Sequence, residues 1–172
     1  MGSPIKFASR VDSLQERIMT ILPTIKFKRL TDTAIIPTRA TSGAACFDLY
    51  ADEAQWLDDM RTRRTVGTGI AIELPPGHVG LVCSRSGLAA KEGIHVINAP
   101  GVIDEDYRGE LKVILGRLPF SPQWPSPDII MIEQGMRIAQ LMILPLPQLE
   151  VAEVSDLTTT ERGAGGLGST GV

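Results

Sequence analysis

The stretch from residue 101 to residue 110, GVIDEDYRGE, sets three acidic side chains and a tyrosine between two glycines. Apolar runs flank it at 94–97 and at 111–115. Glycines favour turns and such runs have strand character, so the pattern predicts a tight hairpin held by a buried sheet. Acids in this position suit catalysis, and they are equally typical of the solvated tip of a hairpin. Features elsewhere in the chain decide between these two interpretations.

Two further segments have the chemistry that binds a polyphosphate. Residues 161–172, ERGAGGLGSTGV, contain five glycines, one arginine, one serine and one threonine. Glycine lets the main chain approach a phosphate closely, and the planar guanidinium of arginine grips it. The turn at 84–87, SRSG, precedes a predicted short helix at 88–92, where free backbone amides favour an anion. On composition alone 161–172 is a flexible tail, so it gains weight only beside the other segments.

Composition limits the class of protein. A chain of 172 residues with 43% hydrophobic content suits a single domain with a proper core. A formal net charge of -3 argues against broad electrostatic binding to nucleic acid or an anionic membrane, so we expect neither partner. No apolar run approaches the length of a membrane span, and the N-terminus lacks the apolar core of a secretory signal. We therefore expect a cytoplasmic protein.

Cysteine and histidine do not suggest a metal centre. Cys46, Cys83, His78 and His95 are the whole supply of these residue types, and they lack the spacing of a zinc site. We expect both cysteines to be reduced, small core residues.

Glycine and proline recur every eight to fifteen residues, and the stretches between them are short and rich in Val, Ile, Leu and Thr. This rhythm predicts an all-β domain, a sandwich or jelly roll. The predicted strands are 25–30, 46–51, 65–74, 78–83, 109–115, 129–132, 137–144 and 149–154.

The two ends and one loop depart from this pattern. Residues 1–22 have capping-box spacing before an apolar run, which suggests a short amphipathic helix, an arm or a disordered extension. Four prolines and Trp124 in 118–128 exclude a regular central strand and predict an extended loop. We therefore divide the chain into an extension at 1–22, a β domain at 23–156 and a glycine-rich arm at 157–172.

Five segments, taken together and in order, resemble the trimeric dUTP pyrophosphatases (dUTPases). They are GAACFDLYA at 43–51, SRSGLAAKEG at 84–93, NAPGVIDEDYRGE at 98–110, GMRIAQL at 135–141 and RGAGGLGSTG at 162–171. The resemblance implies an all-β subunit with a distorted jelly-roll (β-clip) fold. It also implies a homotrimer, in which the C-terminal arm crosses to a neighbouring subunit and closes over the nucleotide.

The resemblance further implies hydrolysis of dUTP to dUMP and pyrophosphate with Mg²⁺, by attack of water on the α-phosphorus. Asp104 matches the carboxylate that deprotonates this water, and Gln140 and Arg162 match catalytic contacts to the phosphates. Tyr107 matches the aromatic residue that packs on the deoxyribose and excludes a 2′-hydroxyl, and Asn98 matches a residue that recognises uracil. The alternative interpretation of Tyr107 is a core aromatic residue, and in a plain tail Arg162 would be solvated.

The remaining residues implied at the substrate are Arg85, Ser86, Gly87, Gly101, Val102, Ile103, Leu167, Gly168, Ser169 and Thr170. Asp48 matches an acid that reaches the metal through water, since Mg²⁺ is held mainly by the triphosphate. Leu167 departs from the family, which usually has an aromatic residue or histidine that stacks over uracil there.

Two alternatives remain at this stage. A dCTP deaminase shares the fold but uses a glutamate as general base, and the corresponding position here is Ile114, which cannot shuttle protons. A regulator would keep the nucleotide pocket but act through a protein partner, for which the 118–128 loop and the N-terminal extension are the candidate surfaces.

Overall fold

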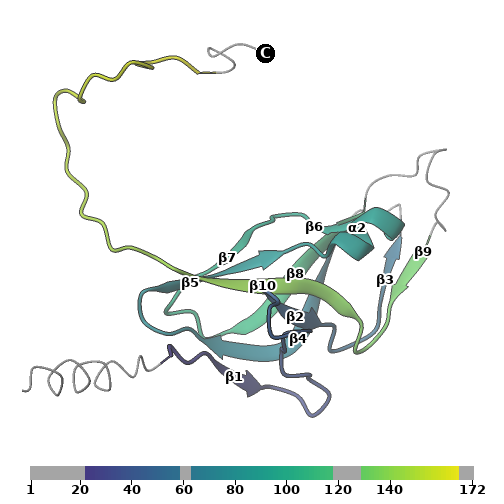
Figure 1. The fold of residues 1–172 in the computed structure, drawn as a ribbon. Coiled ribbons are helices and arrows are strands. Elements are labelled where there is room, and N and C mark those ends of the chain that lie inside the picture. Colours follow the sequence, from purple (N-terminus) through teal and green to yellow (C-terminus); the bar gives the residue numbers. More distant parts are fainter. Residues whose placement is uncertain (1–21, 59–62, 118–128, 167–172) are drawn as a thin grey trace, which may run out of the picture.

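The computed structural model describes residues 22–58, 63–117 and 129–166, and Figure 1 shows the fold. These residues form two four-stranded antiparallel sheets, a two-stranded sheet and one short helix. The first sheet has the order β1 (Lys26–Arg29), β4 (Arg63–Glu73), β8 (Glu110–Arg117), β6 (Ile94–Val96). The second has the order β2 (Phe47–Tyr50), β10 (Arg137–Pro145), β5 (His78–Cys83), β7 (Gly101–Ile103). The third pairs β3 (Gln55–Asp58) with β9 (Ile129–Ile132), and helix α2 spans Ser86–Glu92.

Alternation of side chains builds the core between the two larger sheets. In β8, Leu111, Val113 and Leu115 are almost fully buried while Lys112 and Ile114 face outward. This period of two turns one apolar face inward, as expected for strands with one solvated face. Buried residues of β2, β5 and β10 join those of β4 and β8 in one cluster. The all-β prediction is therefore confirmed.

The predicted strands are confirmed with one exception, the stretch 149–154. No strand forms there, and 146–166 runs away from the body as the yellow segment of Figure 1, with Val151 99% exposed. A strand needs a neighbour whose backbone groups complete its hydrogen bonds, and the described part of the chain offers none beside that stretch. The predicted helix at 88–92 is confirmed and begins two residues earlier, at Ser86.

The predicted hairpin is confirmed in part. Its flanking runs pair with each other, since β6 is antiparallel to β8 with Val96 opposite Leu115, but the connection between them is not a tight turn. Strand β7 pairs with β5 in one sheet, whereas β8 pairs with β4 and β6 in the other. Residues 104–109, hereafter the Asp104 loop, therefore cross from one sheet to the other. Apolar flanks are the same for a hairpin and for such a crossing, because both begin and end in buried strands.

Several predictions fall outside the described residues. They concern the helix or arm at 1–21, the proline-rich loop 118–128, and the arm residues Leu167, Gly168, Ser169 and Thr170. Within the described ranges, no helix has the length and apolar character needed to cross a membrane.

Candidate functional site

A cluster of charged and polar side chains lies where β2, β10 and β5 run side by side. The strand register sets Gln140 opposite both Asp48 and Cys83, so the three residues form a row across the sheet. Arg85, two residues beyond β5, approaches Asp48 at 3.4 Å, and Arg137 approaches the same carboxylate at 3.2 Å. We call Asp48, Arg85, Arg137 and Gln140 the β5 cluster.

Hydrogen bonds to the backbone fix the β5 cluster. The Arg85 guanidinium donates to the carbonyl of Arg137 at 3.0 Å, and Gln140 Nε2 donates to the carbonyl of Ser84 at 2.8 Å. Both bonds tie the turn before α2 to strand β10. The two arginines neutralise Asp48, which leaves a net positive site suited to an anion.

Helix α2 begins next to this cluster. Arg85 is its N-cap residue and makes no side-chain capping bond, while Ser86 and Gly87 are exposed at the first turn. A Cβ added at Gly87 would meet no atom within 4 Å, so its backbone faces open space. A cavity of about 690 Å³ opens beside this turn, between α2 and β9, with Arg85, Gly87, Lys91, Met131 and Arg137 among its lining residues. The volume suits a nucleotide-sized ligand.

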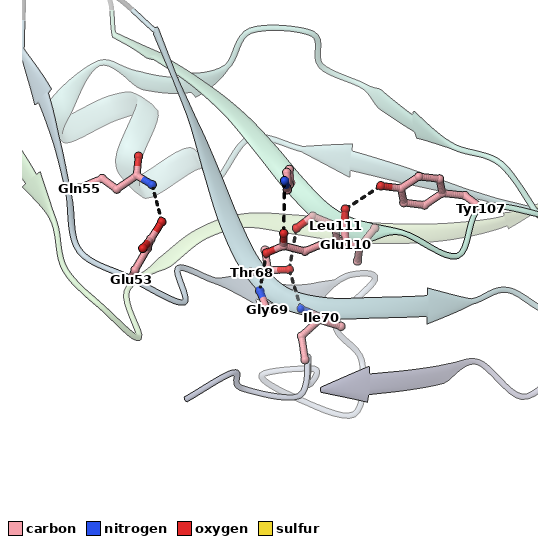
Figure 2. Close-up of polar contacts among 9 residues, drawn as sticks. Glu53, Gln55, Thr68, Gly69, Ile70, Tyr107, Glu110 and Leu111 are labelled. Carbon is pink, nitrogen blue, oxygen red and sulfur yellow. Dashed lines mark hydrogen bonds and ion pairs between the residues drawn. The ribbon is translucent and has the colours of Figure 1, made fainter. Parts of the chain in front are cut away.

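A second group comes from the segment 98–107. Gly101 is buried, and a Cβ there would lie 3.1 Å from the side-chain nitrogen of Asn98, so Asn98 folds against the start of β7. Asp104 follows β7 directly and is exposed, and its carbonyl accepts a hydrogen bond from the amide of Tyr107 at 3.2 Å. The Tyr107 side chain is 41% exposed, and Figure 2 shows its hydroxyl donating to the carbonyl of Glu110, at 2.7 Å.

The Asp104 loop is held by its own polar contacts. Arg108 donates to the carbonyls of Glu105 and Tyr107 at 2.7 and 2.9 Å. The Glu105 carboxylate accepts from the amide of Gly77 at 2.7 Å, which ties the loop to the turn before β5. The loop is therefore positioned, and Asp104 remains accessible on it.

One chain does not bring Asp104 and Arg85 together. Antiparallel pairing puts Gly101 opposite Val82 and Ile103 opposite Gly80, so β7 leads away from Arg85 as it approaches Asp104. At about 3.3 Å per residue, Gly80 and the end of β5 at Cys83 are about 10 Å apart. Asp104 and Arg85 lie farther out at opposite ends of this strand pair. Asn98 and Gly101, by contrast, lie at the Arg85 end.

The arm adds no contact to either group among the described residues. Arg162 Nε donates to the carbonyl of Gly165 at 2.9 Å, within the arm's own turn. Arg162 therefore lies apart from the β5 cluster in this conformation.

The metal prediction rests on Asp48 alone. Among the described residues, no group of three or more His, Cys, Asp and Glu side chains could hold a metal ion. A single carboxylate beside an anion site fits Mg²⁺ that keeps its waters and is bound chiefly by phosphates, because this ion seldom uses an all-protein cage. Cys46 and Cys83 are free and half-buried, and burial raises the pKa of the Cys46 thiol, with Cys83 and Asp48 adding to the rise.

Sequence reasoning missed two residues that the structure links to the site. Arg137 lies in the quoted segment GMRIAQL, and only the pairing of β10 with β2 reveals that it faces Asp48. Glu110 ends the segment NAPGVIDEDYRGE, and only the pairing of β8 with β4 reveals its contacts. Neither role has a signal in local sequence, since both depend on a strand distant along the chain.

Comparison with known proteins decides the family, because the chain matches the dUTPase family over residues 32–171. The chain belongs to the dUTPase family. The deoxyuridine 5′-triphosphate nucleotidohydrolase of Corynebacterium glutamicum is 50% identical over 153 residues, which cover 89% of this chain and 98% of the relative. These matches support neither the dCTP deaminase nor the regulator.

Solved structures agree with the jelly-roll fold. The dUTPase of Staphylococcus bacteriophage 80alpha, solved with dUPNHPP, superposes with a TM-score of 0.78 at 28% identity, covering 87% of this chain and 99% of the phage chain. A mutant dUTPase of phage phi11 of S. aureus, whose structure concerns a structural Mg(II) ion, gives a TM-score of 0.69 at 24% identity. It covers 77% of this chain and 97% of the phage chain, and at that identity it bears on the fold alone.

Proposed function

We propose that this dUTPase family member hydrolyses dUTP to dUMP and pyrophosphate, which limits dUTP and supplies dUMP. The observation that carries the proposal is the family match over 32–171, within which an accessible carboxylate, Asp104, stands on a positioned loop beside Tyr107.

Asp104 deprotonates the water that attacks the α-phosphorus. An exposed carboxylate within hydrogen-bond reach of a water can take its proton. The contacts of Arg108 and Glu105 hold the Asp104 loop in position. The bond from the α-phosphorus to the bridging oxygen breaks as the new bond to water oxygen forms. Pyrophosphate leaves with the electron pair of the broken bond.

The phosphates bind to Arg85, Gln140 and the free amides of Ser86 and Gly87. These donors act on charge that builds on the phosphoryl oxygens in the transition state. Mg²⁺ on the triphosphate would neutralise part of its charge, and Asp48 would hold the ion through water. Arg85 and Arg137 orient the Asp48 carboxylate for this role, since each contacts one of its oxygens.

The nucleoside binds along Asn98 and the β7 backbone at Gly101, Val102 and Ile103. Asn98 offers both a donor and an acceptor, as recognition of the uracil edge requires. The Tyr107 ring packs on the deoxyribose and leaves no room for a 2′-hydroxyl. Steric exclusion of this kind separates dUTP from UTP.

The active unit is a homotrimer, with each site assembled from more than one chain. Asp104 and Arg85 lie at opposite ends of the β5–β7 pair, so a complete site draws them from different subunits. Leu81 lies opposite both Met142 and Val102 on neighbouring strands, and Val102 is 60% exposed in the single chain. A neighbouring subunit would cover this apolar row.

The arm crosses to a neighbouring site, where Arg162, Ser169 and Thr170 contact the phosphates and Leu167 and Gly168 cover the uracil. The exposed path of residues 146–166 away from its own body favours this exchange. Ordering of a glycine-rich arm has an entropic cost that the phosphate contacts must exceed. We propose a cytoplasmic enzyme that binds neither nucleic acid nor membrane.

The test is pyrophosphate release with Mg²⁺ from dUTP, UTP, dCTP and dTTP, with the nucleotide products identified. We expect release from dUTP alone, with dUMP as the product. Conversion of dCTP to a uracil nucleotide, or no turnover by folded protein, would refute the proposal. Asp104→Asn should abolish release while dUTP still binds, because the amide cannot take the proton but keeps the shape. Wild-type turnover in this variant would remove the role of Asp104.

A further inference from the structure

Strand β4 carries a bulge that Glu110 fills. The pairing of β4 with β8 shifts register between Gly67 and Ala71, and Gly69 has a left-handed φ of 62°. Three residues of β4, 68–70, there oppose the single residue Leu111 of β8, so the bulge leaves two residues out of the ladder. As Figure 2 shows, the Glu110 carboxylate accepts a hydrogen bond from the amide of Gly69. Its Oε1 lies 3.0 Å from that nitrogen.

The backbone around this carboxylate is shaped for it. A Cβ added at Gly67 would lie 2.6 Å from Glu110 Oε1, so only glycine leaves room for the side chain there. The neighbouring Thr68 hydroxyl is buried and donates to the carbonyl of Leu111 at 2.7 Å. Two hydrogen bonds that involve side chains therefore join the bulge to β8. The Gly69 amide donates to the Glu110 carboxylate, and the Thr68 hydroxyl donates to the Leu111 carbonyl.

Of these two bonds, only the one between Gly69 and Glu110 involves a residue that contacts Tyr107. The Glu110 carbonyl accepts the Tyr107 hydroxyl, so the residue whose side chain is locked in the bulge also holds the tyrosine ring. The ring lies close over Gly109, where a Cβ would come within 2.6 Å of the hydroxyl oxygen. The Tyr107 amide in turn donates to the Asp104 carbonyl. A chain of contacts thus runs from the β4 bulge to the Asp104 loop.

We propose that Glu110 is a positioning residue: through the bulge of β4 it fixes the Tyr107 ring and so sets the discrimination between deoxyribose and ribose. This inference rests on the proposed function, in which Tyr107 contacts the sugar. Steric exclusion depends on the position of the Tyr107 ring. If the Glu110 backbone could move, the ring could move aside and leave room for a 2′-hydroxyl.

The test compares three variants by the ratio of kcat/KM for dUTP to kcat/KM for UTP. Glu110→Ala leaves the Gly69 amide without its acceptor, and we expect the ratio to fall about fivefold or more, as for loss of one hydrogen bond. Glu110→Gln retains an oxygen that can accept from Gly69 and should keep the wild-type ratio. Thr68→Val removes the other side-chain bond from the bulge to β8, together with the bond that the Ile70 amide donates to the same hydroxyl. It should therefore lower thermal stability without changing the ratio.

A double variant separates positioning from general loosening. On a Tyr107→Phe background, which lacks the hydroxyl held by Glu110, Glu110→Ala should lower the ratio no further. A wild-type ratio in Glu110→Ala, an equal fall in Thr68→Val, or an additive fall in the double variant would each overturn the inference.

A readout that needs no nucleotide keeps the two proposals apart. The chain has two tyrosines, Tyr50 and Tyr107, so labelled tyrosine gives two assignable NMR signals. Glu110→Ala should shift or broaden the Tyr107 signal, while Glu110→Gln and Thr68→Val should leave it in place. If the wild type fails to hydrolyse dUTP, the proposed function falls while this readout still decides the positioning role. If Glu110→Ala does not fold, Glu110→Asp, too short to reach Gly69, takes its place in every measurement.

Discussion

Two inactive variants should restore each other if a site draws on two chains. Asp104→Asn removes the carboxylate that activates water, and Arg85→Gln removes a phosphate contact from the β5 cluster. Asp48 keeps Arg137 as its partner in the second variant, so the substitution leaves no isolated buried charge. Each variant alone should form trimers with little activity.

The expected recovery follows from the geometry. Because Asp104 and Arg85 lie at opposite ends of the β5–β7 pair, we assume that each site takes one from a chain and the other from its neighbour. In a random equimolar mixture of chains in closed trimers, about 25% of sites then receive both wild-type residues. If both residues served a site from the same chain, every chain would carry one defect and no site would be intact.

The assay is pyrophosphate release after the two variants are unfolded, mixed and refolded together. Variants refolded separately and mixed only at the start of the assay are the control, and the assay is kept short to limit exchange of chains between the proposed trimers. Recovery to about 25% of wild-type activity supports sites between chains. Activity no greater than that of the control, in mixed trimers verified by two affinity tags, would refute the argument from strand pairing.

Two further predictions concern the body of the protein. Gly69→Ala should lower the free energy of unfolding by about 2–4 kcal/mol, because a left-handed φ of 62° is combined with contacts of 2.7–2.8 Å to Thr31, Ala34 and Asp52. Gly77→Ala, with a φ of 69° but open space around the Cβ, should cost only about 1 kcal/mol in urea denaturation, and equal losses would contradict the crowding argument. Cys46 should be alkylated by iodoacetamide more slowly than free cysteine, with the midpoint of its pH profile displaced upward, because burial raises the pKa of its thiol and only the thiolate reacts. A midpoint equal to that of free cysteine would show that burial does not act on this thiol.

The strands and the helix were largely predictable because their signals are local. The short apolar runs at 78–83, 111–115 and 129–132 correctly predicted strands. The SRSG turn correctly predicted the start of α2. Strand β3, with the sequence QWLD, was missed because it contains only two apolar residues and no alternation. Strand β7 was missed because its three residues were included in the predicted hairpin. The 149–154 stretch has strand-like composition, but composition cannot supply a partner strand.

The candidate site was likewise predictable only in its residue types. Residue types and their order indicated Asp104, Tyr107, Arg85 and Gln140, and the family match covers all four. Their spatial grouping was not predictable, since Asp104 was placed at the tip of a tight hairpin, whereas it lies in a segment that crosses between the two sheets.

The sequence by itself determined the all-β class, the family and the residue types available for chemistry, because these depend on composition, short-range periodicity and the order of motifs. Only the tertiary structure decided that residues 104–109 cross between sheets, that Arg137 joins Arg85 on Asp48, and that Glu110 closes the β4 bulge beneath Tyr107. Each of these follows from which strands pair and in what register. Pairing between strands far apart in the chain is set by the packing of the whole core, and no local stretch of sequence encodes it.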